Sequence, residues 1–210
     1  MEFQEKLLIA LLGAIITIVI KFFAEKWSQA QRLNNQRKLL IDFIDDIIIR
    51  YCNVNVAEYD KVIEYFNEIE AKIIAESPML NRHIIDYFSK NDLVKIFSVS
   101  KSKFTDFYHY LYEIEFLSNQ CPSLLSENFF NFINNQVKLT LEKDNIPFTN
   151  KNIVLHIKTC TNCQLNINSR IENIKLQKAH YNVLKTNFIE IKDNLKNGRL
   201  KFWLFRFLFK

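Results

Sequence analysis

One apolar run near the amino terminus constrains this chain more than any other feature. The fourteen residues from Leu7 to Ile20 carry no charge, and Thr17 bears the one polar side chain among them. Counted on to Phe23, the run has 17 residues, which is the short end of what crosses a bilayer as a helix. We therefore predict a transmembrane helix at residues 7–24, preceded by an external segment at residues 1–6.

Two other interpretations of this run remain open. Apolar runs of similar length also form the buried core helices of soluble proteins. A cleaved signal peptide is disfavoured, because Glu2 and Glu5 oppose Lys6 where such a peptide carries positive charge. No small-residue cleavage site follows the run either, since Ala24 leads directly into Glu25 and Lys26.

Flanking charge predicts the orientation of the span. Lys6 is the one side-chain cation before it, whereas five follow it: Lys21, Lys26, Arg32, Arg37 and Lys38. The positive-inside rule then places the rest of the chain in the cytoplasm, as a single-pass membrane protein. Lys21 and Trp27 are predicted to lie in the membrane interface, where a long cationic stem and an amphipathic ring are favourable.

Composition predicts an all-α fold. The 210 residues include 2 Gly and 3 Pro, too few for a turn-rich β architecture, and 19 Phe and 8 Tyr supply core material. We predict one cytoplasmic helical domain at residues 25–198, with a first break at Asn53–Asn55 and a helix capped by Asn91 or Asp92 that runs to Leu117. A long final helix carries apolar residues at helical spacing, with a possible break near Ser169. They are Ile153, Ile157, Cys160, Ile167, Ile171, Ile174, Tyr181, Leu184, Phe188, Ile191 and Leu195.

The carboxyl-terminal third is basic. Residues 151–210 hold 12 Lys and Arg against 3 Asp and Glu, which favours an anionic partner such as nucleic acid or the inner leaflet, or is an ordinary solvated face. The last segment, residues 199–210, combines aromatic and basic residues. We predict that Trp203 and Arg206 contact the membrane interface. Packing against a neighbouring subunit or against the chain's own bundle is the alternative.

A lone CxxC pair, Cys160 and Cys163, follows His156 by one turn. On one helix these three residues share a face, so a metal site is geometrically possible, with His180 or water as the fourth ligand. Cys160 also belongs to the apolar stripe, where a thiol acts as a small hydrophobe. A redox CxxC usually occurs in a βαβ setting. We predict core thiols, with no metal centre and no cofactor.

Lys151, Asn152 and His156 open the predicted final helix, just after a loop at Pro147. Spacing of i to i+4 places Asn152 and His156 on one face. A cation, an amide and an imidazole at a helix start together favour an anion such as a phosphodiester.

This Lys-Asn-x-x-x-His string resembles the RNxxxH signature of HEPN domains, with Lys151 where that pattern has arginine. The resemblance implies a HEPN-like helical bundle. In HEPN ribonucleases two protomers bring their motifs together and cleave RNA without metal. Lysine offers a point charge instead of a planar fork that grips phosphate at two points. Together with the single span, the motif resembles the membrane-anchored accessory proteins of type VI-B CRISPR loci.

That resemblance implies a non-enzymatic effector. Such proteins enhance antiphage defence by RNA-guided RNA cleavage, and form a ring-like homo-oligomer that opens a pore in the inner membrane. RNA or the RNA-guided CRISPR effector is then a further partner. Small residues on one face of the span permit close helix approach: Ala10, Gly13, Ala14 and Thr17.

Two alternatives to the pore function remain. A membrane-tethered HEPN-type ribonuclease would use His156 as acid or base, Lys151 as the phosphate cation and Asn152 to orient the substrate. A membrane-tethered scaffold is the third class.

Overall fold

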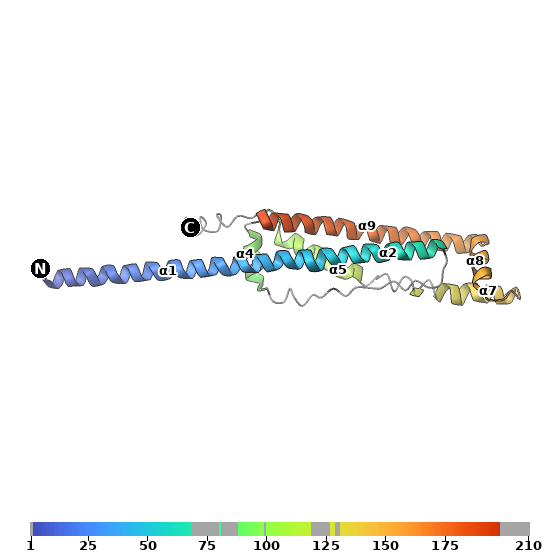
Figure 1. Ribbon diagram of the computed structural model, residues 1–210, viewed down its shortest axis with the longest axis horizontal. Helices are drawn as coiled ribbons and strands as arrows, with labels where there is room; N and C mark the ends of the chain where they lie inside the picture. Colours follow the sequence, from blue (N-terminus) through green and yellow to red (C-terminus); the bar gives the residue numbers. More distant parts are fainter. Residues whose placement is uncertain are drawn as a thin grey trace.

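The computed structural model describes residues 2–68, 80, 88–98, 100–118, 127–128 and 131–197. Every regular element in these ranges is a helix, which confirms the all-α class. The molecule is elongated, and the first part of α1 (Glu2–Asp42) extends well beyond the bundle that the other helices form (Figure 1). The predicted basic and aromatic segment at residues 199–210 lies outside the described residues.

One continuous helical rod runs from the amino terminus through the bundle. It consists of α1, a π-helix η1 (Phe43–Ile49) and α2 (Arg50–Glu68). At 1.5 Å per residue the rod is about 100 Å long. A π-helix bonds residue i to i+5, so residues five apart align. The buried pairs Phe43 with Ile48 and Ile44 with Ile49 have this spacing.

The predicted break at Asn53–Asn55 is wrong, because α2 continues through it. Asn55 is buried, and its side-chain amide donates a hydrogen bond to the carbonyl oxygen of Tyr51 at 2.9 Å. Asparagine disfavours a helix mainly because its side chain competes for backbone groups. Here that bond is made to the carbonyl one turn earlier, so the helix keeps its course.

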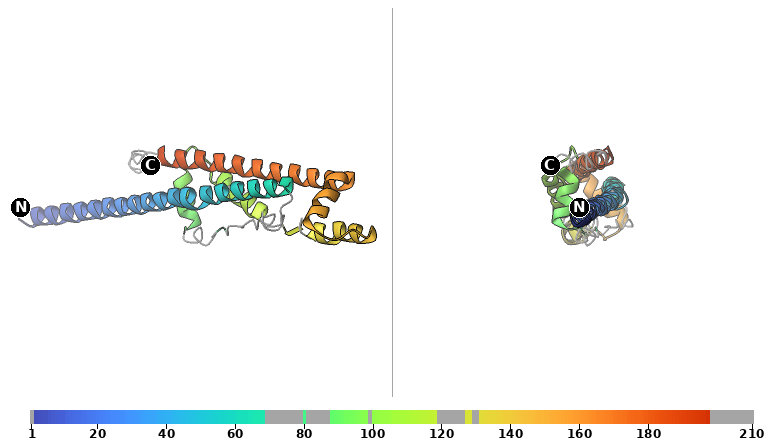
Figure 2. Two further views of the ribbon diagram at one scale, coloured as in Figure 1. Left: turned by 45° about the vertical axis from the view of Figure 1, so that its right-hand side comes forward. Right: turned by 90° about the vertical axis from the view of Figure 1, so that its left-hand side faces the viewer.

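The long helix α9 (Thr161–Asn197) lies antiparallel to η1 and α2. Two ion pairs fix the register: Lys192 with Asp45 at 2.8 Å, and Lys178 with Asp60. The two helices lie side by side in both views (Figure 1, Figure 2). The predicted stripe from Ile167 to Leu195 is confirmed, since all of its members in α9 are buried.

Two further helices cover the half of the bundle nearer to the free end of α1. A single helix predicted up to Leu117 is in fact α4 (Lys90–Ser98) and α5 (Phe104–Ser118). Ser89 caps α4, because its Oγ accepts the Asp92 N–H at 3.1 Å. Asp92 is itself buried and pairs with Arg32 of α1 at 3.0 Å. α5 packs on α9, where the rings of Phe107 and Phe188 meet edge to face.

The far end of the bundle is closed by short helices: η2 (Ile133–Val137), α7 (Lys138–Lys143) and α8 (Asn150–Thr159). α8 runs across the end of the bundle between α7 and α9 (Figure 2). The prediction of one unbroken final helix is therefore wrong, and so is a break near Ser169. The chain turns at Cys160, whose backbone is extended (φ −84°, ψ 108°).

Candidate functional site

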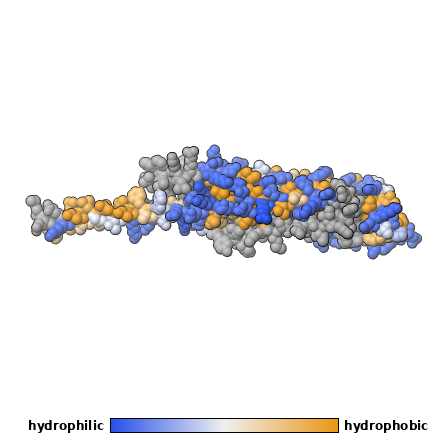
Figure 3. Space-filling view, in the orientation of Figure 1, coloured by the Kyte–Doolittle hydropathy of each residue, from blue (hydrophilic) through white to orange (hydrophobic). Residues whose placement is uncertain are grey.

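The first candidate site is the free part of α1. Within the described residues, one helix is long and apolar enough to cross a membrane, and none of its apolar window is buried. Leu33 is the first buried residue of the rod. A core helix of this fold would be covered, so the core-helix alternative is not supported by the structure. Figure 3 shows this apolar segment projecting from a largely polar bundle.

The four small residues of the span are all exposed on α1: Ala10, Gly13, Ala14 and Thr17. The Thr17 hydroxyl donates to the Gly13 carbonyl oxygen at 2.7 Å, so its proton has a partner within the helix itself. A Cβ added at Gly13 would meet no atom within 4 Å. This face is therefore available to lipid or to another helix.

Residues predicted for the membrane interface follow the apolar run. Lys21 and Trp27 are both exposed, and the ammonium of Lys26 lies 5.5 Å from the centroid of the Phe22 ring. The region from Ala24 to Arg32 contains no buried residue, so it separates the apolar run from the bundle. Trp203 and Arg206 lie outside the described residues, and their interface role stays a prediction.

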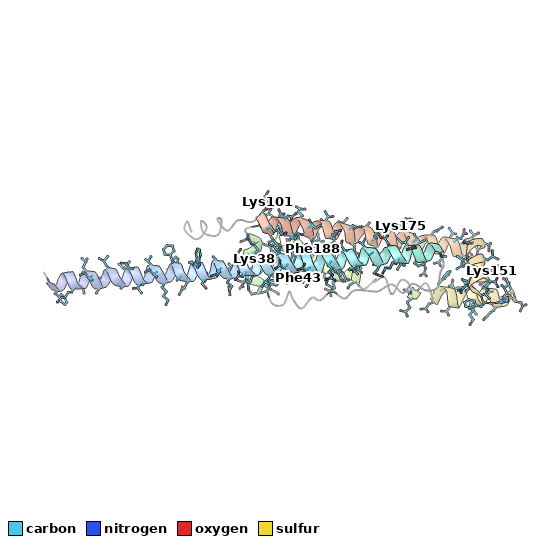
Figure 4. The ribbon with its side chains drawn as sticks, viewed as in Figure 1. Lys38, Phe43, Lys101, Lys151, Lys175 and Phe188 are labelled. Carbon is cyan, nitrogen blue, oxygen red and sulfur yellow. The ribbon has the colours of Figure 1, made fainter. Side chains whose placement is uncertain are left out.

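The second candidate site is at the opposite end, on α8, where Figure 4 labels Lys151. Thr149 caps this helix by accepting the Asn152 N–H at 3.3 Å. The Asn152 side-chain amide donates to the Pro147 carbonyl oxygen at 2.8 Å and so closes the preceding loop. Lys151 is exposed. Asn152 thus has a structural role in this chain, whatever else it contacts.

His156 faces a different neighbourhood from Asn152. One ring nitrogen of His156 and the sulfur atoms of Cys160 and Cys163 all lie within 4.8 Å of one another. The motif residues share a helix, as predicted, but the side chains of Asn152 and His156 have separate partners. The sequence placed His156, Cys160 and Cys163 on one face of a straight helix, whereas in the structure they meet at the corner between α8 and α9.

The corner at Cys160 is built by hydrogen bonds from both helices. The Cys160 N–H donates to the His156 carbonyl oxygen at 2.8 Å and ends α8, while the Gln164 N–H donates to the Cys160 carbonyl oxygen at 3.0 Å and begins α9. The Gln164 side chain also donates to the Lys158 carbonyl oxygen. Thr159 and Thr161 flank the corner, and their low helix propensity is the one sequence signal for it.

The two thiols of the corner differ in acidity. Hydrogen bonds from the backbone N–H and the thiol of Cys163 lower the pKa of Cys160. Burial, and then the hydrogen bond to Cys160, raise the pKa of Cys163 to about 11. Cys160 is therefore the sulfur that more readily becomes a thiolate. Cys52 is a third free thiol, buried in α2, where burial raises its pKa to about 12.

His180 does not join this cluster, so it is not the fourth ligand that the sequence suggested. It is 17 residues beyond Cys163 on α9, about 25 Å along the helix axis. Its Nε2 lies 3.4 Å from a carboxylate oxygen of Glu113 on α5.

Comparison with protein-family models, with curated proteins and with solved structures found no match to this chain. The chemistry of its two ends is therefore argued from its own residues.

Proposed function

We propose that this protein is a membrane-anchored effector of a bacterial inner membrane, which oligomerises as a ring and opens a pore that depolarises the cell. One observation carries this proposal: the apolar run of α1 is wholly uncovered, while the same helix continues into a packed bundle. So large an apolar surface is costly in water, and lipid is the environment that removes the cost.

A pore requires several copies, because one helix cannot surround a channel. The exposed small-residue face supports close contact between neighbouring spans. Thr17 is compatible with a place inside the membrane, because its hydroxyl bonds the Gly13 carbonyl oxygen. The polar bundle would then stand on the cytoplasmic side, where the cations after the span predict it to be.

The resemblance of Lys151, Asn152 and His156 to the HEPN signature is the basis for assigning this effector to CRISPR antiphage defence. RNA or an RNA-guided effector would then act on the far end of the bundle. In the proposed assembly this motif is an interface element and not a nuclease centre. The hydrogen bond from Asn152 to the Pro147 carbonyl oxygen supports a structural role for this amide, since it closes the loop before α8.

A tethered HEPN-type ribonuclease is the alternative. Exposed Lys151 in the first turn of α8 favours it, because a cation at a helix start attracts a phosphodiester. The lysine remains a weaker phosphate clamp than arginine.

Replacing Gly13 by leucine tests the pore. A Cβ added at Gly13 meets no atom of its own chain within 4 Å, so the new side chain extends toward a neighbouring span or lipid. We expect Gly13→Leu to insert normally, to form smaller oligomers in native mass spectrometry, and to lose depolarisation measured with a potential-sensitive dye. Ile15→Phe is the matched control, because it adds bulk about 200° away around the helix. Unchanged assembly and depolarisation in Gly13→Leu would contradict the proposal.

An RNA-cleavage assay without metal separates the two functions. We expect purified wild-type protein to leave RNA intact while it assembles. If the wild type cuts RNA and His156→Ala stays assembled but does not, the ribonuclease function replaces the pore.

A further inference from the structure

The corner between α8 and α9 gathers three of the strongest soft-metal ligands in proteins. They are the imidazole of His156 in the last turn of α8, the thiol of Cys160 at the turn itself, and the thiol of Cys163 in the first turn of α9. Their ligand atoms lie within 4.8 Å of one another. No regular helix spans the three positions, so the backbone turn at Cys160 creates this proximity.

We propose that His156, Cys160 and Cys163 bind one Zn²⁺ ion per chain, with a fourth position left to water or to a ligand from a partner. Zn²⁺ takes sulfur at about 2.3 Å and histidine nitrogen at about 2.0–2.1 Å in a tetrahedron. Two such sulfurs then lie about 3.8 Å apart. The three ligand atoms lie within 4.8 Å of one another, close to this spacing.

The surroundings of the corner select a thiophilic ion. The sequence from Asn145 to Ile171 contains no Asp or Glu, so this segment offers no carboxylate of the kind that Mg²⁺ and Ca²⁺ require. The backbone N–H groups of Cys163 and Asn162 donate to the Cys160 sulfur, as hydrogen bonds commonly brace a metal-bound thiolate.

The site is partly open. Side chains of His156 and Cys160 are half-buried, so an ion can enter from solvent. Three protein ligands leave one coordination position, which is the pattern of zinc sites that accept an exchangeable ligand. Within the described residues, no Asp or Glu joins these three ligands in the cluster.

Zinc at this corner would hold α8 across the end of the bundle. It would also engage the imidazole that the HEPN-like motif supplies, so His156 would be a ligand and not a general base. This inference goes beyond the pore proposal, because it stands whether or not the spans assemble.

Metal binding is tested on the full chain purified in detergent under reducing conditions. After incubation with ZnCl₂ and removal of unbound zinc, we expect elemental mass spectrometry to find about one zinc ion per chain. With Co²⁺ as the probe, we expect the visible bands of tetrahedral coordination and a sulfur-to-cobalt charge-transfer band. These spectra are measured on the wild type, so they do not depend on whether a variant folds.

Four variants locate the site. Cys160→Ser, Cys163→Ser and His156→Asn should each weaken zinc binding by more than about 100-fold, because the loss of a direct ligand exceeds that of its hydrogen-bond partner. His180→Asn is the matched control and should bind as the wild type does.

Three results would overturn the proposal. The first is no zinc in the reduced wild type. The second is undiminished zinc in Cys160→Ser and Cys163→Ser, which would place the ion elsewhere. The third is a Cys160–Cys163 disulfide whose reduced form binds neither zinc nor cobalt, which would make the pair a redox couple.

Discussion

Gln177 is the residue that explains the gap in the apolar stripe of α9. It occupies the position between Ile174 and Tyr181 where the helical period requires a buried side chain, and it is buried. The Tyr59 hydroxyl of α2 donates to its Oε1 at 3.0 Å. A directional bond inside an otherwise apolar interface favours one register of α9 on α2 over a shift by one turn.

Removing the donor of this bond should destabilise the bundle. We expect Tyr59→Phe to lower the free energy of unfolding by about 1–3 kcal/mol, because the amide oxygen of Gln177 loses a partner inside the core. The double variant Tyr59→Phe with Gln177→Leu should lose less free energy of unfolding than the two single variants lose together. Denaturant titrations of the detergent-solubilised protein, followed by circular dichroism, measure this. Tyr112→Phe, at a residue 69 % exposed, is the control. Equal losses in Tyr59→Phe and Tyr112→Phe would contradict the prediction.

At the scale of elements, the ion pair of Asp45 on η1 with Lys192 on α9 predicts a pH dependence. The hydrogen bond from Lys192 lowers the pKa of Asp45 below 3.8. The pKa of Asp45 is lower in the folded protein than in the unfolded chain. The stability that the pair contributes is therefore present at pH values above the unfolded-state pKa, and it is lost as the pH falls through the folded-state pKa. Asp45→Asn should therefore destabilise slightly at neutral pH, by ~0–1 kcal/mol for a pair this exposed, and match the wild type in strong acid.

Thermal unfolding of the wild type and of Asp45→Asn, measured from neutral pH down to strong acid, tests this prediction. Asp46→Asn removes the same charge from the adjacent exposed position and is the control. A gap between Asp45→Asn and the wild type that widens in acid would refute the assignment.

Periodicity predicted the helices of this fold better than their ends. The stripe from Ile167 to Leu195 was evident because a buried helical face repeats every three to four residues. The corner at Cys160 was not evident from the sequence. The apolar period continues across it, from Ile153 and Ile157 of α8 into α9. Both helices bury that face, and only the three-dimensional course of the chain shows that they are separate.

The candidate site was predictable in part for the same reason. Spacing alone placed His156, Cys160 and Cys163 on one face of a straight helix, whereas in the structure the corner at Cys160 brings them together. The role of Asn152 could not be predicted, because its bond to the Pro147 carbonyl oxygen depends on how the loop folds back. The suggestion of His180 as a fourth ligand is wrong, because α9 is straight there and places His180 about 25 Å from Cys163 along the helix axis.

At the scale of the whole molecule, the two candidate sites lie at opposite ends of one rod. From Leu33, where burial begins, to Glu68 is about 50 Å along the helix axis. Lys38 and Lys151, labelled in Figure 4, mark the two ends of the bundle. Whatever contacts α8 therefore acts far from the span, and any influence on a pore must pass along the bundle.

Because the rod is continuous, we predict that the rotational angle of the span relative to the bundle, about the helix axis, affects function. Two alanines inserted after Ser28 turn the span by about 200° relative to the bundle, whereas seven helix-forming residues return it to within about 20°. In the proposed ring, we expect the two-residue insertion to abolish depolarisation and the seven-residue insertion to retain it. The potential-sensitive dye and native mass spectrometry apply again. Equal activity in both would show that the connection does not transmit orientation.

The unbroken passage from α1 into the bundle has a mechanical consequence. Between Gly13 and the end of α2 there is neither glycine nor proline, so no such residue interrupts the rod where it enters the bundle. A domain on a loose tether could tumble freely above the membrane. Here the bundle and the apolar end of α1 belong to one continuous helical rod, so a rotation of the bundle about the helix axis turns the apolar end with it.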